Sequence, residues 1–229
     1  MNFSFSKYQV ATAIAILLHA IGLVGILFFD RDFFVQATVM NLLLMLLLLI
    51  WTQPGKNIFF FLFIVAAFGF GMLAEIVGVN TQSLFGEYQY GKVLGSKFMK
   101  VPLVIGVNWF LIIYCCGISI HTLLMKAIER ISSETQSKPM ALKSVSVILD
   151  GATIAVFFDW IMEPVAQKLG FWQWGEGGDI PLFNYITWLL ISMSLMVVFH
   201  FTPFPKQNKF AVHLLLIQMM FFLLLRTFL

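Results

Sequence analysis

The sequence predicts an all-α protein that crosses a membrane about seven times. Of its 229 residues, 60% are hydrophobic and only 11% are charged, and the mean hydropathy is +0.93. A soluble domain is usually about half apolar and about a quarter charged. The apolar residues also form continuous runs, unlike the alternating strands of a membrane barrel. We therefore expect residues 1–229 to form a single transmembrane helical domain that has lipid as its solvent.

Seven apolar runs are long enough to cross a bilayer, which takes about 20 helical residues each. They are residues 8–29, 33–51, 58–79, 101–125, 144–163, 181–201 and 209–227. Breakers such as Pro54-Gly55 and Pro203 fall between the runs, where helices are expected to end. No small-residue cleavage site clearly follows the first run, so we expect a retained span and not a signal peptide.

The basic residues indicate on which side of the membrane the N-terminus lies. Eight Lys and Arg residues fall on the N-terminal side of the predicted spans, against six on the other side. Because cytoplasmic loops carry the excess of Lys and Arg, this difference favours a cytoplasmic N-terminus, and we expect a bacterial inner membrane. The formal net charge of +3 is small and the basic residues are scattered, so a nucleic-acid partner is not expected.

Two connecting segments, residues 80–100 and 164–180, are aromatic, rich in glycine and only lightly charged. Both lie on the side opposite the N-terminus. A loop that folds back against a membrane protein needs hydrogen-bond partners within the protein for its backbone N–H and C=O groups. Loops held in this way commonly carry functional residues. We expect these two lid loops to cover one end of the bundle.

The two lid loops also match each other. Residues 86–91 read GEYQYG and residues 170–175 read GFWQWG. The same offset aligns Glu75 with Asp159, and a Pro-x6-Trp motif follows each loop. The match predicts a parallel internal repeat, with units of about 58–125 and 144–201, related by an axis along the membrane normal.

Four of the eleven acidic residues lie inside predicted spans, whereas the fourteen basic residues lie in loops or at span ends. The four are Glu75, Asp150, Asp159 and Glu163. A charged Asp at mid-bilayer costs about 2.5–3.5 kcal/mol, and both burial and a second nearby acid favour the neutral form. At least one of these acids should therefore stay protonated near neutral pH and serve as a proton donor.

Three of these acids are expected to lie at one end of the bundle. Glu75, Asp159 and Glu163 are close to the lid-side ends of their spans, and the last two are four residues apart, on one helix face. Asp150 is deeper and about half a turn round from Asp159, so we expect it in a different contact. If the repeat holds, Glu75 and Asp159 lie at equal depth and face one cavity.

Several other classes of site find no support in the sequence. The four histidines form no H-x-x-H or H-x-x-x-H pair, so no metal site is expected. No aspartate-rich cluster is present that would hold magnesium and diphosphate. The last span has Lys only at its start, which argues against a retinal Schiff base.

The motifs around the three acids resemble those of a known family. In chain order they are Glu75, FGxYxY at 85–90, VP at 101–102 with Trp109, DxxxEP at 159–164, GFWxW at 170–174 and IPxxNxxxW at 180–188. Together they are similar to the CruF-type carotenoid 1,2-hydratases, which include γ-carotene and bisanhydrobacterioruberin hydratases. The resemblance covers about residues 70–200. Family members usually carry Asp before the proline, where this chain has Glu163.

The resemblance implies an enzyme of carotenoid biosynthesis. The family adds water across the terminal C1–C2 double bond of an acyclic carotenoid end and makes a tertiary 1-hydroxy group, without a cofactor. The expected partners are a long acyclic carotenoid such as lycopene or γ-carotene, water, the lipid bilayer and other carotenoid enzymes.

The buried acids suit this chemistry. Protonation at C2 gives a tertiary cation at C1, which aromatic faces stabilise by about 2 kcal/mol or more when desolvated. We expect Asp159 and Glu75 to divide the acid and base roles, in an order that the sequence leaves open, with Glu163 and Asn184 holding the water. The other expected substrate-binding residues are Tyr88, Tyr90, Trp109, Trp160, Trp172, Trp174 and Trp188.

Other functions remain open at this stage. A carotenoid or isoprenoid cyclase would form the same cation but exclude water. A proton-coupled transporter would place its acids across the membrane depth as a relay. Pigment binding without chemistry and a structural subunit are the remaining alternatives.

Overall fold

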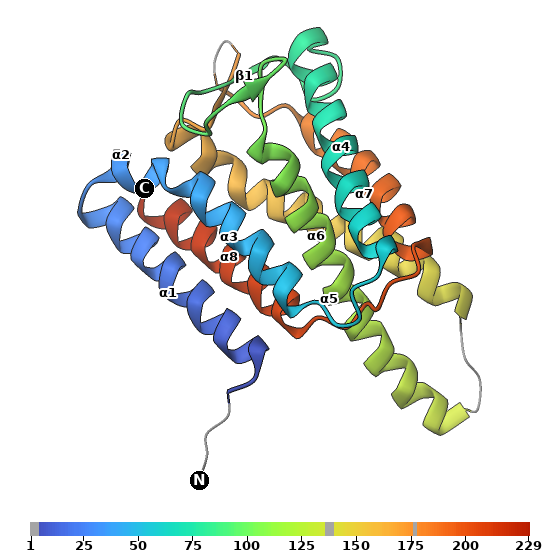
Figure 1. Cartoon of the computed structure of the whole chain (residues 1–229). Helices are drawn as coiled ribbons and strands as arrows, with labels where there is room; N and C mark the ends of the chain where they lie inside the picture. Colours follow the sequence, from blue (N-terminus) through green and yellow to red (C-terminus); the bar gives the residue numbers. More distant parts are fainter. Residues whose placement is uncertain (1–4, 136–139, 176–177) are drawn as a thin grey trace.

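The chain forms a bundle of long helices with a small β-structured cap at one end (Figure 1). The computed structural model describes residues 5–135, 140–175 and 178–229. In chain order the elements are α1 (Lys7–Phe28), α2 (Arg31–Gln36), α3 (Thr38–Thr52), α4 (Ile58–Thr81), β1 (Tyr88–Tyr90), β2 (Lys97–Phe98), β3 (Val101–Pro102), α5 (Val104–Thr135), α6 (Met140–Lys168), β4 (Trp172–Trp174), α7 (Leu182–Phe201) and α8 (Lys209–Phe228).

Within the described residues, seven helical segments are long and apolar enough to cross a membrane, which confirms the predicted all-α polytopic class. α2 and α3, which meet at Ala37, together form the second of them. The outer surfaces of the membrane-crossing helices carry many exposed Leu, Ile, Val and Phe side chains, as a lipid-facing surface should. The chain is therefore an integral membrane protein.

Two helices, α5 and α6, have boundaries that differ from those predicted. Val101 and Pro102 belong to the short strand β3, so α5 begins at Val104, and it continues to Thr135. The fifth span was predicted to end at residue 163, but α6 runs through Pro164 to Lys168. The second lid loop is correspondingly shorter, and its positions 176 and 177 lie outside the described residues.

A contact from α8 explains how α6 passes through Pro164. Proline has no N–H, so the carbonyl of Trp160, four residues back, loses its helical donor. Arg226 Nη1 donates to that carbonyl oxygen at 2.8 Å, and the guanidinium lies 4.1 Å from the centroid of the Trp160 ring. The helix therefore continues, with Asp159 and Glu163 held on the same rigid element.

Replacing Arg226 by Leu should lower the free energy of unfolding by about 1–2 kcal/mol, since a hydrogen bond from a charged donor contributes about 1.5–3 kcal/mol and this one is partly exposed. In a Pro164→Ala background the same replacement should cost less, because residue 164 then supplies the missing N–H. Denaturant unfolding of the four proteins of this double-mutant cycle in detergent measures the difference. Equal costs in the two backgrounds would contradict this role of Arg226.

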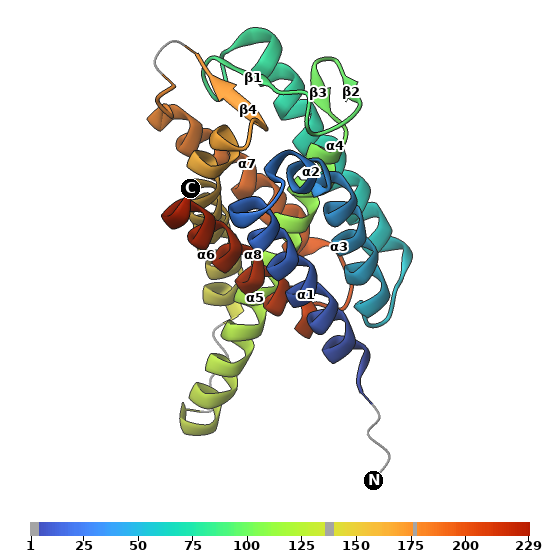
Figure 2. The same cartoon turned by 90° about the vertical axis from the view of Figure 1, so that its left-hand side faces the viewer.

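The helix arrangement separates the two ends of the bundle. α5 is the central helix, and most of its membrane-crossing part is buried. In Figure 1, α4 and α7 lie on one side of it and α1, α3 and α8 on the other. The first described residues lie at the end away from the β strands, and Figure 2 shows β1 and β4 together above the bundle.

The two lid loops pair directly with each other. β1 and β4 are antiparallel, with Tyr88 opposite Trp174 and Tyr90 opposite Trp172. Gln89 lies opposite Gln173, its own match in the predicted repeat. A two-fold axis through this pair would produce that register. The indoles of the two Pro-x6-Trp motifs also stack on each other, with centroids 4.0 Å apart. The repeat itself stays a prediction.

Candidate active site

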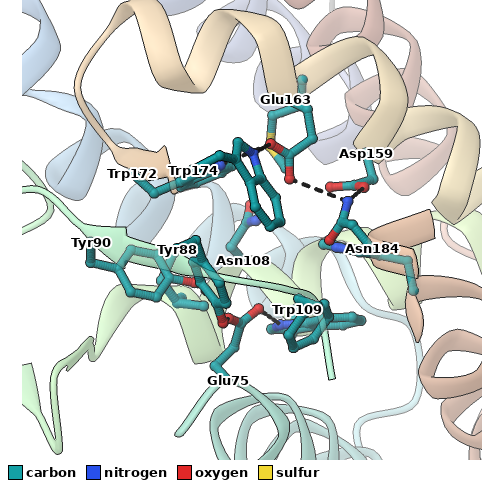
Figure 3. Close-up of a pocket in the computed structure, with 14 residues that line it drawn as sticks. Glu75, Tyr88, Tyr90, Asn108, Trp109, Asp159, Glu163, Trp172, Trp174 and Asn184 are labelled. Atoms are coloured by element: carbon teal, nitrogen blue, oxygen red, sulfur yellow. Dashed lines mark hydrogen bonds between the residues drawn. The ribbon is translucent and has the colours of Figure 1, made fainter. Parts of the chain in front are cut away.

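A pocket beneath the paired lid strands brings the three buried acids together (Figure 3). Glu75 comes from α4, Asp159 and Glu163 from α6, and Asn184 from α7. The hollow has a volume of about 20 Å³, which is enough for one water molecule. Its wall consists of Glu75, Phe85, Tyr88, Tyr90, Ile105, Asn108, Trp109, Asp159, Met162, Glu163, Trp172, Trp174, Asn184 and Trp188. Glu75 and Asp159 thus line one cavity, on opposite sides of it in Figure 3.

Three hydrogen-bond donors surround the Glu75 carboxyl. The hydroxyls of Tyr88 and Tyr90 donate to its Oε2 at 2.6 and 2.8 Å, and Trp109 Nε1 donates to its Oε1 at 3.0 Å. Burial, and then the charge of Glu75, raise the pKa of both tyrosine phenols, so they keep their protons and act as donors. A carboxyl that accepts three donors is best suited to the ionised form.

Small residues of α4 make room for these donors. A side chain at Gly71 would collide with the Trp109 ring, and one at Gly78 would collide with Phe85 and approach the Tyr88 hydroxyl. These glycines are four residues before and three after Glu75, on its own helix face. The small-residue face therefore admits aromatic rings to the carboxyl.

Two indoles bind the carboxyl of Glu163. Trp172 and Trp174 Nε1 donate to its Oε2 at 2.9 and 3.0 Å, and Asn184 Nδ2 lies 3.5 Å from its Oε1. Alternate residues of a strand point to the same face, so β4 directs both tryptophans into the pocket and Gln173 outward. β1 does the same with Tyr88 and Tyr90.

The third acid, Asp159, has a different environment. Its side chain is fully buried, and its Oδ2 accepts a hydrogen bond from Asn184 Nδ2 at 2.9 Å. Its Oδ1 is also buried and has no hydrogen-bond partner among the described residues. An oxygen without a donor suits the protonated form, since a hydroxyl there needs an acceptor and not a donor. Asp159 is thus the acid of this pocket that has an oxygen without a hydrogen-bond donor among the described residues.

The pocket lies in a chain that resembles known carotenoid proteins. A family model described as "Carotenoid biosynthesis protein" matches residues 33–229. The chain belongs to this family. It is also 28% identical over 130 residues to the bisanhydrobacterioruberin hydratase of Haloarcula japonica, a match that spans 56% of this chain and 40% of that protein. No solved structure matches the chain significantly.

The two matches confirm the predicted CruF-type carotenoid hydratase family and a role in carotenoid biosynthesis. Within this family member, the predicted residues Tyr88, Tyr90, Trp109, Trp172, Trp174, Asn184 and Trp188 all line the acid pocket. Their rings also contact one another, since Tyr88 lies 5.3 Å from Trp174 and Tyr90 lies 5.9 Å from Trp172 between centroids. The aromatic wall is continuous across the two lid loops.

Trp160 and Asp150 lie outside the acid pocket, and one residue that lines the pocket was not predicted from the sequence. Trp160 is 44% exposed on the outer surface against Arg226 and does not line the pocket. Asp150 is also exposed and accepts a hydrogen bond from Ser146, a contact apart from the pocket, as expected. Asn108 lines the pocket but was not predicted. An amide within the apolar run 101–125 was the available signal, because polar groups inside spans often serve function.

Among the described residues, no three His, Cys, Asp or Glu side chains are grouped so that they would hold a metal ion. The pocket instead offers three carboxyls, two phenols, four indoles and two amides. These groups donate, accept or transfer protons and present aromatic faces. Groups of these kinds can carry out acid–base chemistry on an apolar molecule.

Proposed function

We propose that the protein adds water to the terminal C1–C2 double bond of an acyclic carotenoid end. The observation that carries the proposal is the buried Oδ1 of Asp159, which has no partner among the described residues and lines a pocket whose other two acids accept several donors. Family membership supplies the carotenoid, and the name of the Haloarcula relative supports hydration.

In the proposed reaction Asp159 is the acid. Its O–H gives the proton to C2, the π electrons of the C1–C2 bond form the new C–H bond, and C1 becomes a tertiary cation. The oxygen of one water then bonds to C1, and a proton leaves that water for the Glu75 carboxylate. Return of a proton from Glu75 to Asp159 through pocket water restores the enzyme, so the net change is addition of one water.

The aromatic wall stabilises the cation in this proposal. Tyr88, Tyr90, Trp172 and Trp174 converge on the pocket, and a desolvated cation–π contact is worth about 2 kcal/mol or more. Their O–H and N–H groups donate to the two glutamates, which fixes the orientation of the rings around the pocket. Glu163 and Asn184 hold the attacking water in the pocket that Glu75 also lines.

The grouping of the acids favours this chemistry over a proton relay. Glu75, Asp159 and Glu163 meet in one pocket near the lid end, whereas a relay needs acids spread along the membrane depth. We further propose that the N-terminus is cytoplasmic in a bacterial inner membrane, which places the pocket toward the opposite face. Other carotenoid enzymes would supply the substrate and take the product.

Expression in a lycopene-producing host should yield carotenoids heavier by one water, detected by mass spectrometry against the same host without the gene. Growth in water labelled with oxygen-18 should place the label in the new hydroxyl. Purified protein acting on unlabelled lycopene in heavy water should place one deuterium at C2. A product with the unchanged mass of lycopene would instead support the cyclase. If the protein forms no product from lycopene or from any other acyclic carotenoid, the proposal is contradicted.

A further inference from the structure

A larger cavity adjoins the acid pocket. It has a volume of about 520 Å³, and its mostly aliphatic and aromatic wall comes from α1, α2, α3, α5, α6, α8 and the lid loops. This size is within the range of sites for small organic ligands, about 300–1,000 Å³. Four side chains line both hollows, namely Ile105, Asn108, Met162 and Trp172. We call the larger hollow the tail chamber.

The tail chamber reaches the outer surface of the bundle at α2 and α3. Its wall residues Phe33, Met40 and Leu47 are 65%, 70% and 60% exposed. In a bilayer this surface faces hydrocarbon, because it belongs to a membrane-crossing segment. A long apolar molecule can therefore pass sideways from the lipid into the chamber and toward the acids.

The apolar wall also contains polar side chains, among them Gln218, Asn41 and His19. Gln218 is 5% exposed, and its amide makes no hydrogen bond to the part of the chain that the structure describes. Asn41 Oδ1 is buried and likewise has no partner among those residues. His19 is 6% exposed, and its Nδ1 is bonded to the Ala15 carbonyl at 2.8 Å, which leaves Nε2 for another partner.

Unpaired polar groups at this depth call for a ligand. A buried donor or acceptor without a partner costs about 1–3 kcal/mol, and polar groups inside membrane spans typically mark a functional contact. A lipid acyl chain would fill the apolar wall but offer no polar partner to the two amides or to His19 Nε2. An isoprenoid chain that carries oxygen satisfies both parts of the wall, because a hydroxyl can donate to one group and accept from another.

We propose that the tail chamber holds the tail of a long isoprenoid substrate whose reacting end lies in the acid pocket, and that His19, Asn41 and Gln218 bind hydroxyl or carbonyl oxygen on that tail. This inference rests on the proposed function and names the class of substrate for it. The acid pocket alone has space for one water, so the reacting end enters by displacing the shared side chains Asn108 and Met162.

A pair of glycine variants tests the chamber. Gly22 lines the chamber, and the nearest atom to a new Cβ there is a Phe221 ring carbon at 3.7 Å. The Cβ of a leucine therefore fits at this position, and the rest of the leucine side chain occupies space in the chamber. Gly69, on the exposed face of α4, has no atom within 4 Å of a new Cβ, and Gly69→Leu is the matched control. Binding is read from quenching of tryptophan fluorescence by the polyene, in a catalytically silent Asp159→Asn background. Gly22→Leu should weaken binding of lycopene and of monohydroxylated lycopene at least tenfold, and Gly69→Leu should change neither.

A second pair tests the oxygen contacts. Asn41→Leu keeps the branching of the side chain and Gln218→Met keeps its length, and both remove the amide. Each should weaken binding of monohydroxylated lycopene roughly tenfold and leave lycopene binding equal or tighter. Unchanged affinity for the hydroxylated carotenoid in both variants would overturn the oxygen contacts, and unchanged binding in a folded Gly22→Leu protein would overturn the chamber.

The binding experiments test the chamber independently of the proposed hydration, because carotenoid binding does not require the reaction to occur. Wild-type protein that binds carotenoid through the chamber but adds no water would refute the hydration and keep the chamber. Wild-type protein that adds water, together with a Gly22→Leu variant that adds it equally well, would keep the hydration and refute the chamber.

Discussion

Asp159→Asn should lower the kcat for water addition at least about 10³-fold, within the 10²–10⁴-fold contribution of a general acid, while carotenoid binding persists. The amide keeps the shape of the side chain and its contact with Asn184, but it has no acidic proton to give to C2. Product formation is measured by chromatography and mass spectrometry on protein in lipid vesicles. Fluorescence quenching measures the retained binding.

The matched control for this prediction is Asp150→Asn. It is the same substitution on the same helix, at an exposed residue that does not line the pocket, and its kcat should stay close to that of the wild type. Near-normal hydration by Asp159→Asn would remove Asp159 from the acid role. A large loss in Asp150→Asn would show instead that the helix responds to any lost carboxyl.

Glu75→Gln is expected to have the second largest effect, a fall in kcat of about 10²–10⁴-fold. Gln cannot take the proton from the attacking water. Its NH₂ group would also face the Tyr88 and Tyr90 hydroxyls or the Trp109 N–H, all of which donate to the carboxylate. At least one donor then loses its acceptor, so the lid should close less firmly and KM should rise together with the fall in kcat.

Glu87→Gln serves as its control, because Glu87 is exposed on the same lid loop and does not line the pocket. That variant should keep both kcat and KM. Deuterium labelling provides a further check, since wild-type protein in heavy water should place one deuterium at C2 for each hydroxyl formed. Full activity of Glu75→Gln would assign the base role to another group, with Glu163 the next carboxyl in the pocket.

The sequence alone predicted the spans, the two lid loops and the three acids that the structure brings together. This was possible because bilayer thickness sets the length of an apolar run and because an acid inside such a run is rare enough to stand out. The predicted end of the fifth span was wrong for an equally physical reason. Pro164 normally stops a helix, and the donor that replaces its missing N–H comes from Arg226, 62 positions further along the chain.

Which acid gives the proton in the proposed reaction was beyond sequence reasoning. In the sequence, Glu75, Asp159 and Glu163 are equivalent, since each is an acid within an apolar run. In the structure, Glu75 accepts three hydrogen bonds, whereas Asp159 Oδ1 accepts none from the described residues. The donors come from β1, β4 and α5, and only their packing decides which carboxyl each one reaches. The misplaced Trp160 is a similar case, since one residue step along α6 turns a side chain from the pocket to the surface.

Residue order by itself determined that this is a polytopic membrane protein with acids near one end and two matched aromatic loops, because hydrophobic length and residue type are local properties. Tertiary structure decided that the loops pair as β1 and β4, that their rings contact two of the carboxyls, and that the acid pocket adjoins a larger apolar chamber. Those features depend on which side chains meet across helices distant in the chain, and packing and hydrogen-bond geometry settle that only when all the helices are in place.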